Sequence, residues 1–253
     1  MDRGIYAVAS SGLTNLRKLE VVNNNLANVN TPGFKRQVIV TDELEFEDTF
    51  AKEIAKSDLY AKGDHDRTPG VKNIRAVTDF TPGAIKHTGN PLNVALTAPN
   101  QFFSVQTPEG VQYTRAGTFT LNDQGTLVTD DGMPVLGSGG PVQTEGPGIR
   151  INKSGTVLSG SIVLGEIQVV EFSNPQALER VGANRFKPTS ATGAPTQVEA
   201  KLAENSLEMA NVSAVSSMVE MITANRGFEM YTRTAQSIDQ LNQSAISQIG
   251  RAR

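Results

Sequence analysis

The chain of 253 residues contains no cysteine and no tryptophan, and only two histidines. Without cysteine, disulfide bonds and thiolate metal sites are excluded. The formal net charge of −3 at pH 7 argues against nucleic acid as a partner, because proteins that bind DNA or RNA carry a basic excess or a basic patch. The composition therefore favours neither thiol chemistry nor nucleic-acid binding.

Long hydrophobic runs are also absent from the sequence. No run approaches the roughly 18 apolar residues that a membrane-spanning helix needs, so we expect no direct insertion into a membrane. The opening Met-Asp-Arg-Gly-Ile-Tyr lacks the continuous apolar stretch of a secretory signal peptide. If the protein is exported, we expect a route that does not depend on a cleaved signal peptide.

Motifs for catalysis and cofactor binding are missing too. His65 and His87 have no partner at a metal-ligand spacing, and no phosphate loop, zinc-helix motif or dinucleotide fingerprint occurs. Asp130-Asp131-Gly132 lies between two β-patterned runs, which indicates a hairpin turn rather than the carboxylate pair of a glycosidase. The sequence therefore predicts that the protein is not an enzyme and has no cofactor and no metal site.

Residues 1–30 have the pattern of an amphipathic helix. Apolar or small residues recur at alternating steps of four and three, which is the spacing of a heptad seam. The predicted seam consists of Ile5, Ala9, Gly12, Leu16, Leu19, Asn23 and Leu26. The alternative is an ordinary amphipathic helix that packs on a globular core. Thr31-Pro32-Gly33 ends the predicted helix, because the residue before proline avoids helical backbone angles.

A second long helix is predicted at the other end, over residues 205–249, starting at either Asn205 or Ser213. Val212, Val215, Val219 and Ile222 form one apolar stripe. A second, slightly rotated stripe consists of Phe228, Tyr231, Ala235, Ile238, Ala245 and Ile249. About 45 helical residues would extend roughly 65–70 Å, a length typical of a bundle or coiled coil.

The middle of the chain has a β pattern. From Val71 to about Ala200, short apolar runs alternate with Gly-rich and Asp-rich turns, which favours an antiparallel sandwich or partial barrel. The predicted fold class is α+β, with a central all-β domain and long N- and C-terminal helices that form a coiled-coil or helical tube domain. The expected divisions are an N-terminal helix in 1–36, a connecting segment in 37–75, the β domain in 76–200 and a C-terminal helix in 201–253. Within the connecting segment, the charged residues 42–62 suit a short helix or a stretch that orders on assembly.

Three groups of motifs resemble the bacterial flagellar basal-body rod and hook family. Residues 24–35, Asn-Asn-Leu-Ala-Asn-Val-Asn-Thr-Pro-Gly-Phe-Lys, are similar to its N-terminal signature. Residues 211–229 are similar to its C-terminal signature, with Asn225-Arg226 and Phe228-Glu229 where Gln-Arg and Tyr-Glu are usual. Residues 113–119 and 125–129 look like its β-domain motifs, whereas the turn at 98–100 departs from the usual pattern. The resemblance covers almost the whole chain.

Within the family, the opening residues and the length are most similar to proximal-rod members, ahead of distal-rod members and the longer hook protein. The resemblance implies a structural subunit that assembles helically with copies of itself and with other proximal and distal rod subunits, and that transmits torque from motor to hook. It also implies export through the flagellar type III apparatus and a place in the periplasmic rod of the basal body.

The resemblance further implies which residues lie at assembly interfaces. On the N-terminal helix they are the seam residues named above. On the C-terminal helix they are Val212, Val215, Val219, Ile222, Arg226, Phe228, Tyr231 and Ile238. The motif turn consists of Asn24, Asn25, Asn28, Thr31, Gly33 and Phe34, which suits either a fraying helix end or a packed polar turn that pairs carboxamides between neighbouring chains. Arg115 is expected to pair with a carboxylate on a neighbouring loop or subunit, or to be solvated.

Two other classes of function remain open at this point. A coiled-coil stalk could present a β domain to a carbohydrate or a host surface, although the aromatic content of 6% offers little material for an aromatic binding platform. A hydrolase would need a convergent acid and base pair, which the sequence does not reveal.

Overall fold

The computed structural model describes residues 2–42, 73–146, 148–182 and 184–251. The charged segment 42–62 and His65 therefore lie, except for Asp42, outside the described residues. The described part of the chain contains two α-helices, one 3₁₀-helix and nineteen β-strands. These elements form two compact units, which we call the helical unit and the β unit. Of the described residues, 2–24, 37–42, 73–77 and 215–251 belong to the helical unit, and the others belong to the β unit.

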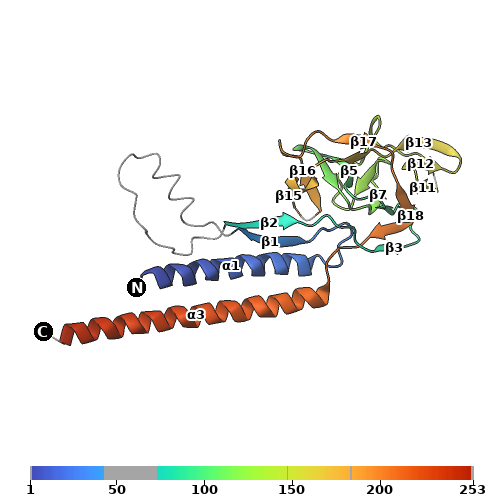
Figure 1. Cartoon of the computed structure of the whole chain (residues 1–253). Coiled ribbons are helices and arrows are strands. Elements are labelled where there is room, and N and C mark those ends of the chain that lie inside the picture. Colours follow the sequence, from blue (N-terminus) through green and yellow to red (C-terminus); the bar gives the residue numbers. More distant parts are fainter. Residues whose placement is uncertain (1, 43–72, 147, 183, 252–253) are drawn as a thin grey trace, which may run out of the picture. The chain divides into compact units, whose positions relative to one another are not determined.

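The helical unit contains α1 (Asp2–Ala27) and α3 (Ala214–Arg251). The two helices lie side by side and run in opposite directions (Figure 1), and a Cβ added to Gly227 of α3 would lie 3.3 Å from Nδ2 of Asn15 on α1. A two-stranded sheet of β1 (Gln37–Asp42) and β2 (Asn73–Thr78) belongs mostly to the same unit. The start of α3 at Ala214 agrees with the start predicted at Ser213. Asn205 instead lies in a turn between two strands, with φ of 51°.

The predicted α+β fold with terminal helices in a coiled-coil tube is wrong. Most of the described elements are strands, and several apolar residues that were predicted to lie between helices are exposed. Leu16 is 42% exposed, and Val215, Val219 and Ile222 are 73%, 58% and 53% exposed. Within a coiled coil, residues at these positions would insert between the helices. A step of three and four residues identifies an apolar face of a helix, but it does not identify what covers that face.

The β unit is built around one six-stranded sheet, with the strand order β15-β16-β6-β5-β14-β17. Its strands are β5 (Gln101–Thr107), β6 (Gly110–Thr114), β14 (Val169–Glu171), β15 (Glu179–Val181), β16 (Arg185–Lys187) and β17 (Thr196–Val198). All of its neighbouring strands pair in the antiparallel sense. The 3₁₀-helix η1 (Pro175–Ala177) lies in the connection from β14 to β15.

Smaller antiparallel sheets complete this unit. The three-stranded sheet consists of β11 (Ile149–Ile151), β12 (Thr156–Ser159) and β13 (Ile162–Glu166). The pairs are β3 (Ile85–His87) with β19 (Ser206–Glu208), β4 (Val94–Leu96) with β18 (Leu202–Glu204), β7 (Phe119–Leu121) with β8 (Leu127–Thr129), and β9 (Leu136–Gly137) with β10 (Gly140–Pro141). Residues just before α3, which were predicted to be helical, thus form strands β18 and β19.

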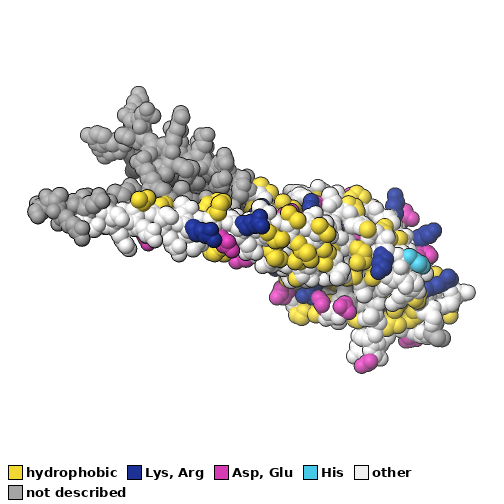
Figure 2. All heavy atoms as spheres, turned by 90° about the horizontal axis from the view of Figure 1, so that it is seen from below, with side chains coloured by type: hydrophobic (Ala, Val, Ile, Leu, Met, Phe, Trp, Pro, Cys, Tyr) yellow, Lys and Arg dark blue, Asp and Glu magenta, His cyan; other side chains and the backbone are white. Residues whose placement is uncertain are grey.

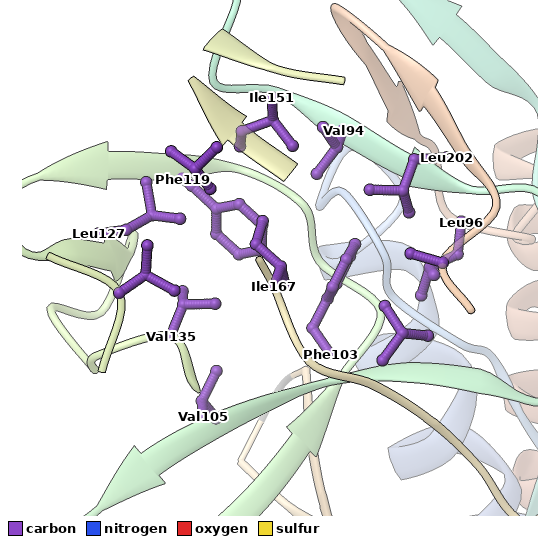
Figure 3. Packing of buried hydrophobic residues seen from close by; sticks show 14 of the residues in the cluster. Val94, Leu96, Phe103, Val105, Phe119, Leu127, Val135, Ile151, Ile167 and Leu202 are labelled. Atoms are coloured by element: carbon purple, nitrogen blue, oxygen red, sulfur yellow. The ribbon is translucent and has the colours of Figure 1, made fainter. Parts of the chain in front are cut away.

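Strand β5 separates two hydrophobic cores, because successive side chains of a strand point to opposite faces of the sheet. Phe103 and Val105 belong to the larger core, which Figure 3 shows packed around Phe103 and Phe119. Their rings meet edge to face with centroids 5.1 Å apart, an arrangement that aromatic pairs favour. Phe102 belongs to a second, aromatic core on the other face. A central strand buried on both faces ties the β unit together.

We expect Phe103→Ala to lower the free energy of unfolding by about 3–5 kcal/mol, because it removes a fully buried ring from the centre of the larger core. Leu121→Ala is the matched control, since Leu121 is 38% exposed on the neighbouring strand pair, and its cost should be much smaller. Denaturant unfolding followed by circular dichroism measures both. Equal losses for the two variants would contradict this account of the core.

Candidate site: a buried ion cluster and an exposed helix face

The N-terminal motif turn enters the β unit through a tight contact at Gly33. Its backbone N–H donates to the carbonyl oxygen of Glu208 at 2.7 Å. Gly33 has φ of 70°, and a Cβ at this position would lie 2.3 Å from the backbone nitrogen of Ala116. Both the left-handed backbone and the close approach require glycine. The glycine of the motif is therefore explained by packing inside the chain.

Phe34 and Lys35 continue this contact. Phe34 is fully buried, and the guanidinium carbon of Arg180 lies 4.6 Å from the centre of its ring, within the range of a cation–π interaction. Arg180 also donates through Nη2 to the carbonyl oxygen of Lys35. Burial lowers the pKa of Arg180 to about 10, so its guanidinium is still cationic at neutral pH. Arg180 therefore binds both the ring and the backbone of the motif.

Three buried charges meet beside Phe34. Glu208 at the end of β19 accepts from Nζ of Lys35 at 2.7 Å through Oε1, and from Nε of Arg115 at 2.8 Å through Oε2. All three side chains are at most 1% exposed. We call Lys35, Arg115 and Glu208 the ion cluster. It joins the N-terminal motif, the segment after β6 and the segment before α3.

The members of the ion cluster also make hydrogen bonds to the backbone. Lys35 donates to the carbonyl oxygen of Thr81 at 2.7 Å, and the N–H of Gly83 donates to Oε1 of Glu208 at 2.9 Å. Nη1 of Arg115 donates to the carbonyl oxygens of Ala98 and Gln101, and Nη2 donates to that of Leu96. Buried charges are tolerated when each is paired and hydrogen-bonded in this way. Through these hydrogen bonds, the ion cluster connects several segments of the chain.

The electrostatics of the cluster differ between its members. Burial acts to raise the pKa of Glu208, but the charges of Arg115 and Lys35 and their hydrogen bonds outweigh it, so the pKa lies below the ordinary 4.5. Burial lowers the pKa of the Lys35 ammonium from 10.5, and the Glu208 carboxylate offsets part of this effect. The carboxylate is therefore ionised at neutral pH.

Sequence reasoning missed most of this cluster. Arg115 was expected to find a carboxylate on a neighbouring loop or subunit, and its carboxylate is Glu208 of the same chain. The sequence offered Asn205, three residues before Glu208, as a possible helix start, but both residues lie among strands. The available signal was that Lys35 and Arg115 each stand within a motif, and that Glu208 lies three residues before the motif at 211–229. Nothing local connects Lys35 with Glu208, which are 173 residues apart.

The motif turn is held by contacts within its own chain. The hydroxyl of Thr31 donates to Oδ1 of Asn28 at 3.2 Å, and the N–H of Asn28 donates to the carbonyl oxygen of Asn25. Asn25 is buried, whereas Asn24 is exposed at its side. A role for this turn in pairing with other chains stays a prediction.

The predicted seam of α1 is only partly covered. Ile5 and Ala9 lie on α1, but their side chains are outside the described residues. Gly12, Leu19 and Leu26 are half-buried, whereas Leu16 and Asn23 are exposed. The buried apolar residues of this helix are Val21 and Val22, which lie beside the predicted seam. Leu13, which the heptad pattern omits, is 64% exposed.

Helix α3 has two apolar faces. Ser217 and Ala224 are buried, and Met221, Gly227, Phe228, Tyr231 and Ile238 are half-buried on the same side, which is the side that contacts α1 at Asn15. On the other side, Val215, Met218, Val219, Ile222, Met230 and Leu241 are exposed. At 100° per residue, these two sets lie almost opposite each other. The two stripes predicted as slightly rotated are therefore nearly opposite faces, and Val212 precedes the helix.

We call the surface formed by the first four exposed residues, Val215, Met218, Val219 and Ile222, the outer face of α3. Figure 2 shows hydrophobic side chains gathered over the first turns of this helix. Val215, Met218, Val219 and Ile222 recur at steps of three and four residues and are each more than half exposed. The exposed residue Arg226 lies on the same side, one turn further along. A cluster of exposed apolar residues of this kind marks a contact surface.

Other kinds of site find little support in the described ranges. In this part of the chain, no group of three or more His, Asp or Glu residues is arranged to hold a metal ion. None of the described helices is long and apolar enough to cross a membrane.

Comparison with known proteins gives three family matches along the chain. Residues 7–35 match the family described as flagella basal body rod protein. Residues 98–169 match the flagellar hook protein FlgE/F/G D1 domain, and residues 203–248 match the flagellar basal body rod FlgEFG protein C-terminal family. Each match contains one member of the ion cluster, with Lys35 in the first, Arg115 in the second and Glu208 in the third.

Individual relatives match over nearly their whole length. A flagellar basal-body rod protein FlgF of Caulobacter vibrioides is 31% identical, over 99% of both chains. A flagellar basal-body rod protein FlgG of the same species is 34% identical, over 95% of this chain and 97% of the relative. A FlgG rod protein of Bacillus subtilis is 30% identical, over 98% and 99%.

The lowered pKa of Glu208 predicts acid sensitivity. Because its folded pKa lies below the unfolded value, its contribution to stability is present above about pH 4.5 and is lost as the pH falls through the folded pKa. We expect Glu208→Gln to lower the free energy of unfolding at pH 7 by roughly 3–5 kcal/mol, since it leaves two buried cations without a counter-charge. The difference from wild type should shrink as the pH falls below about 4.5, as measured by denaturant unfolding at each pH.

Glu199→Gln is the matched control for this experiment, because Glu199 is an exposed carboxylate in the same unit. It should have little effect at any pH. A pH-independent difference between wild type and Glu208→Gln would argue against an ionised Glu208 in the folded protein.

Proposed function

We propose that this chain, which belongs to the flagellar basal-body rod protein family, is a subunit of the proximal rod that binds its neighbours through the outer face of α3. It is a structural rod subunit, and its place is the flagellar basal body, in the periplasmic region. The single observation that carries the contact is the row of exposed apolar residues on a helix whose opposite side is already covered.

The energetics favour assembly through this face. Burying a Val, Ile or Met side chain stabilises a contact by about 1.5–3 kcal/mol relative to leaving it in water. Val215, Met218, Val219 and Ile222 offer four such side chains within the first turns of α3. Their burial against neighbouring rod subunits, whether copies or relatives, would offset the entropy lost on association. A contact made head to tail without closing generates a helical assembly.

Other residues named from the sequence belong to the same proposal. Leu16 of α1 and Arg226 of α3 are exposed, and we assign them to contacts with neighbouring subunits. Phe228, Tyr231 and Ile238 are half-buried on the covered side of α3, so we assign them a smaller share of these contacts. In such an assembly the subunit carries torque from the motor towards the hook.

The place within the rod rests on the opening residues and the length, which resemble proximal-rod members. FlgF and FlgG relatives match at similar identity, so identity alone does not separate a proximal from a distal subunit. We further propose that the subunit reaches the rod through the flagellar type III export apparatus. The stalked surface-binding module is set aside, because the full-length relatives are rod proteins.

Deletion of the gene in its own bacterium tests the place in the rod. Electron microscopy of purified basal bodies should reveal rods that stop short and carry no hook, because later subunits lack their support. A stub at the base of the rod supports the proximal place, and a longer stub supports the distal one. Complete flagella that rotate normally would contradict the proposed function.

The outer face of α3 is tested by Ile222→Asp. The folded monomer should keep its unfolding midpoint, because Ile222 is 53% exposed, but incorporation into the rod should be lost, since a charge buried in an apolar contact is strongly unfavourable. Thr232→Asp is the matched control, because Thr232 is exposed and lies on neither apolar face. Complementation of the deletion strain and basal-body imaging measure both; motile cells carrying Ile222→Asp would overturn the contact.

A further inference from the structure

The two segments that lead from the β unit towards the terminal helices lie against each other. Residues 28–36 follow α1, and residues 209–213 lead into α3. The N–H of Arg36 donates to Oδ1 of Asn211 at 2.7 Å, and Lys35, the preceding residue, pairs with Glu208 at 2.7 Å. The N–H of Gly33 donates to the carbonyl oxygen of Glu208. Residues 33–36 and 208–211 are therefore joined by three successive contacts.

A third segment joins them at the same point. Asp79 follows β2; its Oδ2 accepts from Nε of Arg36 at 2.8 Å, and its N–H donates to the carbonyl oxygen of Arg36. The Nδ2 group of Asn211 donates to the carbonyl oxygens of Asp79 and Thr81 at 2.8 and 3.1 Å. One carboxamide thus connects the three segments through which the β unit continues into the rest of the chain.

We propose that Lys35, Glu208 and Asn211, supported by Arg115 and Asp79, form a clasp that carries mechanical load between the two ends of the β unit. The proposal rests on the function proposed above, because a rod subunit under torque is loaded through its ends. The load would pass directly from residues 33–36 to residues 208–211. It would bypass the strand pairs of the β unit.

The chemistry of the clasp suits this role. Its contacts lie side by side between the same two segments, so a force on the ends is shared among them. The paired strands β3 and β19, or β4 and β18, could instead be peeled apart one hydrogen bond at a time. Hydrogen bonds to ionised groups are about twice as strong as those between neutral groups, and the burial of Lys35 and Glu208 keeps water from replacing either partner.

The absence of native cysteine allows the load to be applied at chosen points of the full chain. Handles at Asn30→Cys and Ser213→Cys, both exposed positions, pull the two segments apart across the clasp. Handles at Asp123→Cys and Ser161→Cys, exposed positions in two turns of the β unit, pull along an axis that avoids it. Optical trapping of single molecules measures the unfolding rate at constant force on each axis.

We expect Lys35→Met and Asn211→Ala each to raise the unfolding rate on the clasp axis by roughly 10- to 100-fold. Each variant removes hydrogen bonds to a charged or buried partner that stabilise the folded state and are already broken in the transition state, so the barrier falls. On the second axis, the change should be no more than about threefold. Lys201→Met removes an exposed lysine of the same unit and should change neither rate. Should Lys35→Met fail to fold, Asn211→Ala, with a half-buried side chain, decides the matter.

Two results would overturn the clasp. Equal acceleration on both axes would mean that these residues stabilise the fold without directing load, and an unchanged rate on the clasp axis would mean that load takes another route. The measurement uses isolated molecules, so it does not depend on rod assembly. Normal flagella in the deletion strain would contradict the proposed function as a rod subunit. The unfolding rates on the two axes would still test the clasp.

Discussion

The carboxylate of Glu208 is the constraint on which the β unit depends. A charge taken out of water must be compensated by counter-charges and hydrogen bonds, and Glu208 receives both from Lys35, Arg115 and the N–H of Gly83. These donors come from parts of the chain that are far apart in sequence. The beginning, the middle and the end of the β unit must therefore meet at one buried point. The close packing of Gly33 against Ala116 and the stacking of Arg180 on Phe34 follow from the same meeting.

The two units of the chain differ in how completely they bury their apolar residues. In the β unit, β5 is covered on both faces, and two hydrophobic cores contain the buried aromatic residues other than Phe34. In the helical unit, α3 is covered on one side and exposed on the other, over residues that water solvates poorly. The first unit buries its two hydrophobic cores within one chain, whereas the second leaves an apolar face of α3 exposed, which under the proposed function is covered by neighbouring subunits. A packed β unit together with a helix that has an exposed apolar side suits a protein whose function is assembly.

The family relationship gives this arrangement its context. The three family matches contain the motif turn, the β segment with Arg115, and the segment that runs from the strands before α3 into the helix. Three residues of the N-terminal motif are buried inside the β unit, namely Gly33, Phe34 and Lys35. Motif residues in an assembling protein thus do not all belong to its interfaces. Some instead hold the segment that leads into α3.

The motifs of the chain identify the family, and its periodicity and turn residues identify a helix at each end and the β pattern between them, because all of these are local properties of the sequence. The periodicity also located the apolar positions Val215, Val219 and Ile222. The packing of distant segments determines that these residues stay exposed and that α3 begins at Ala214 after two strands. It alone pairs Lys35 with Glu208 across 173 residues. A repeat in the sequence indicates which side of a helix is apolar. The packing of distant segments determines what covers that side, and it also determines which residue pairs with a buried charge.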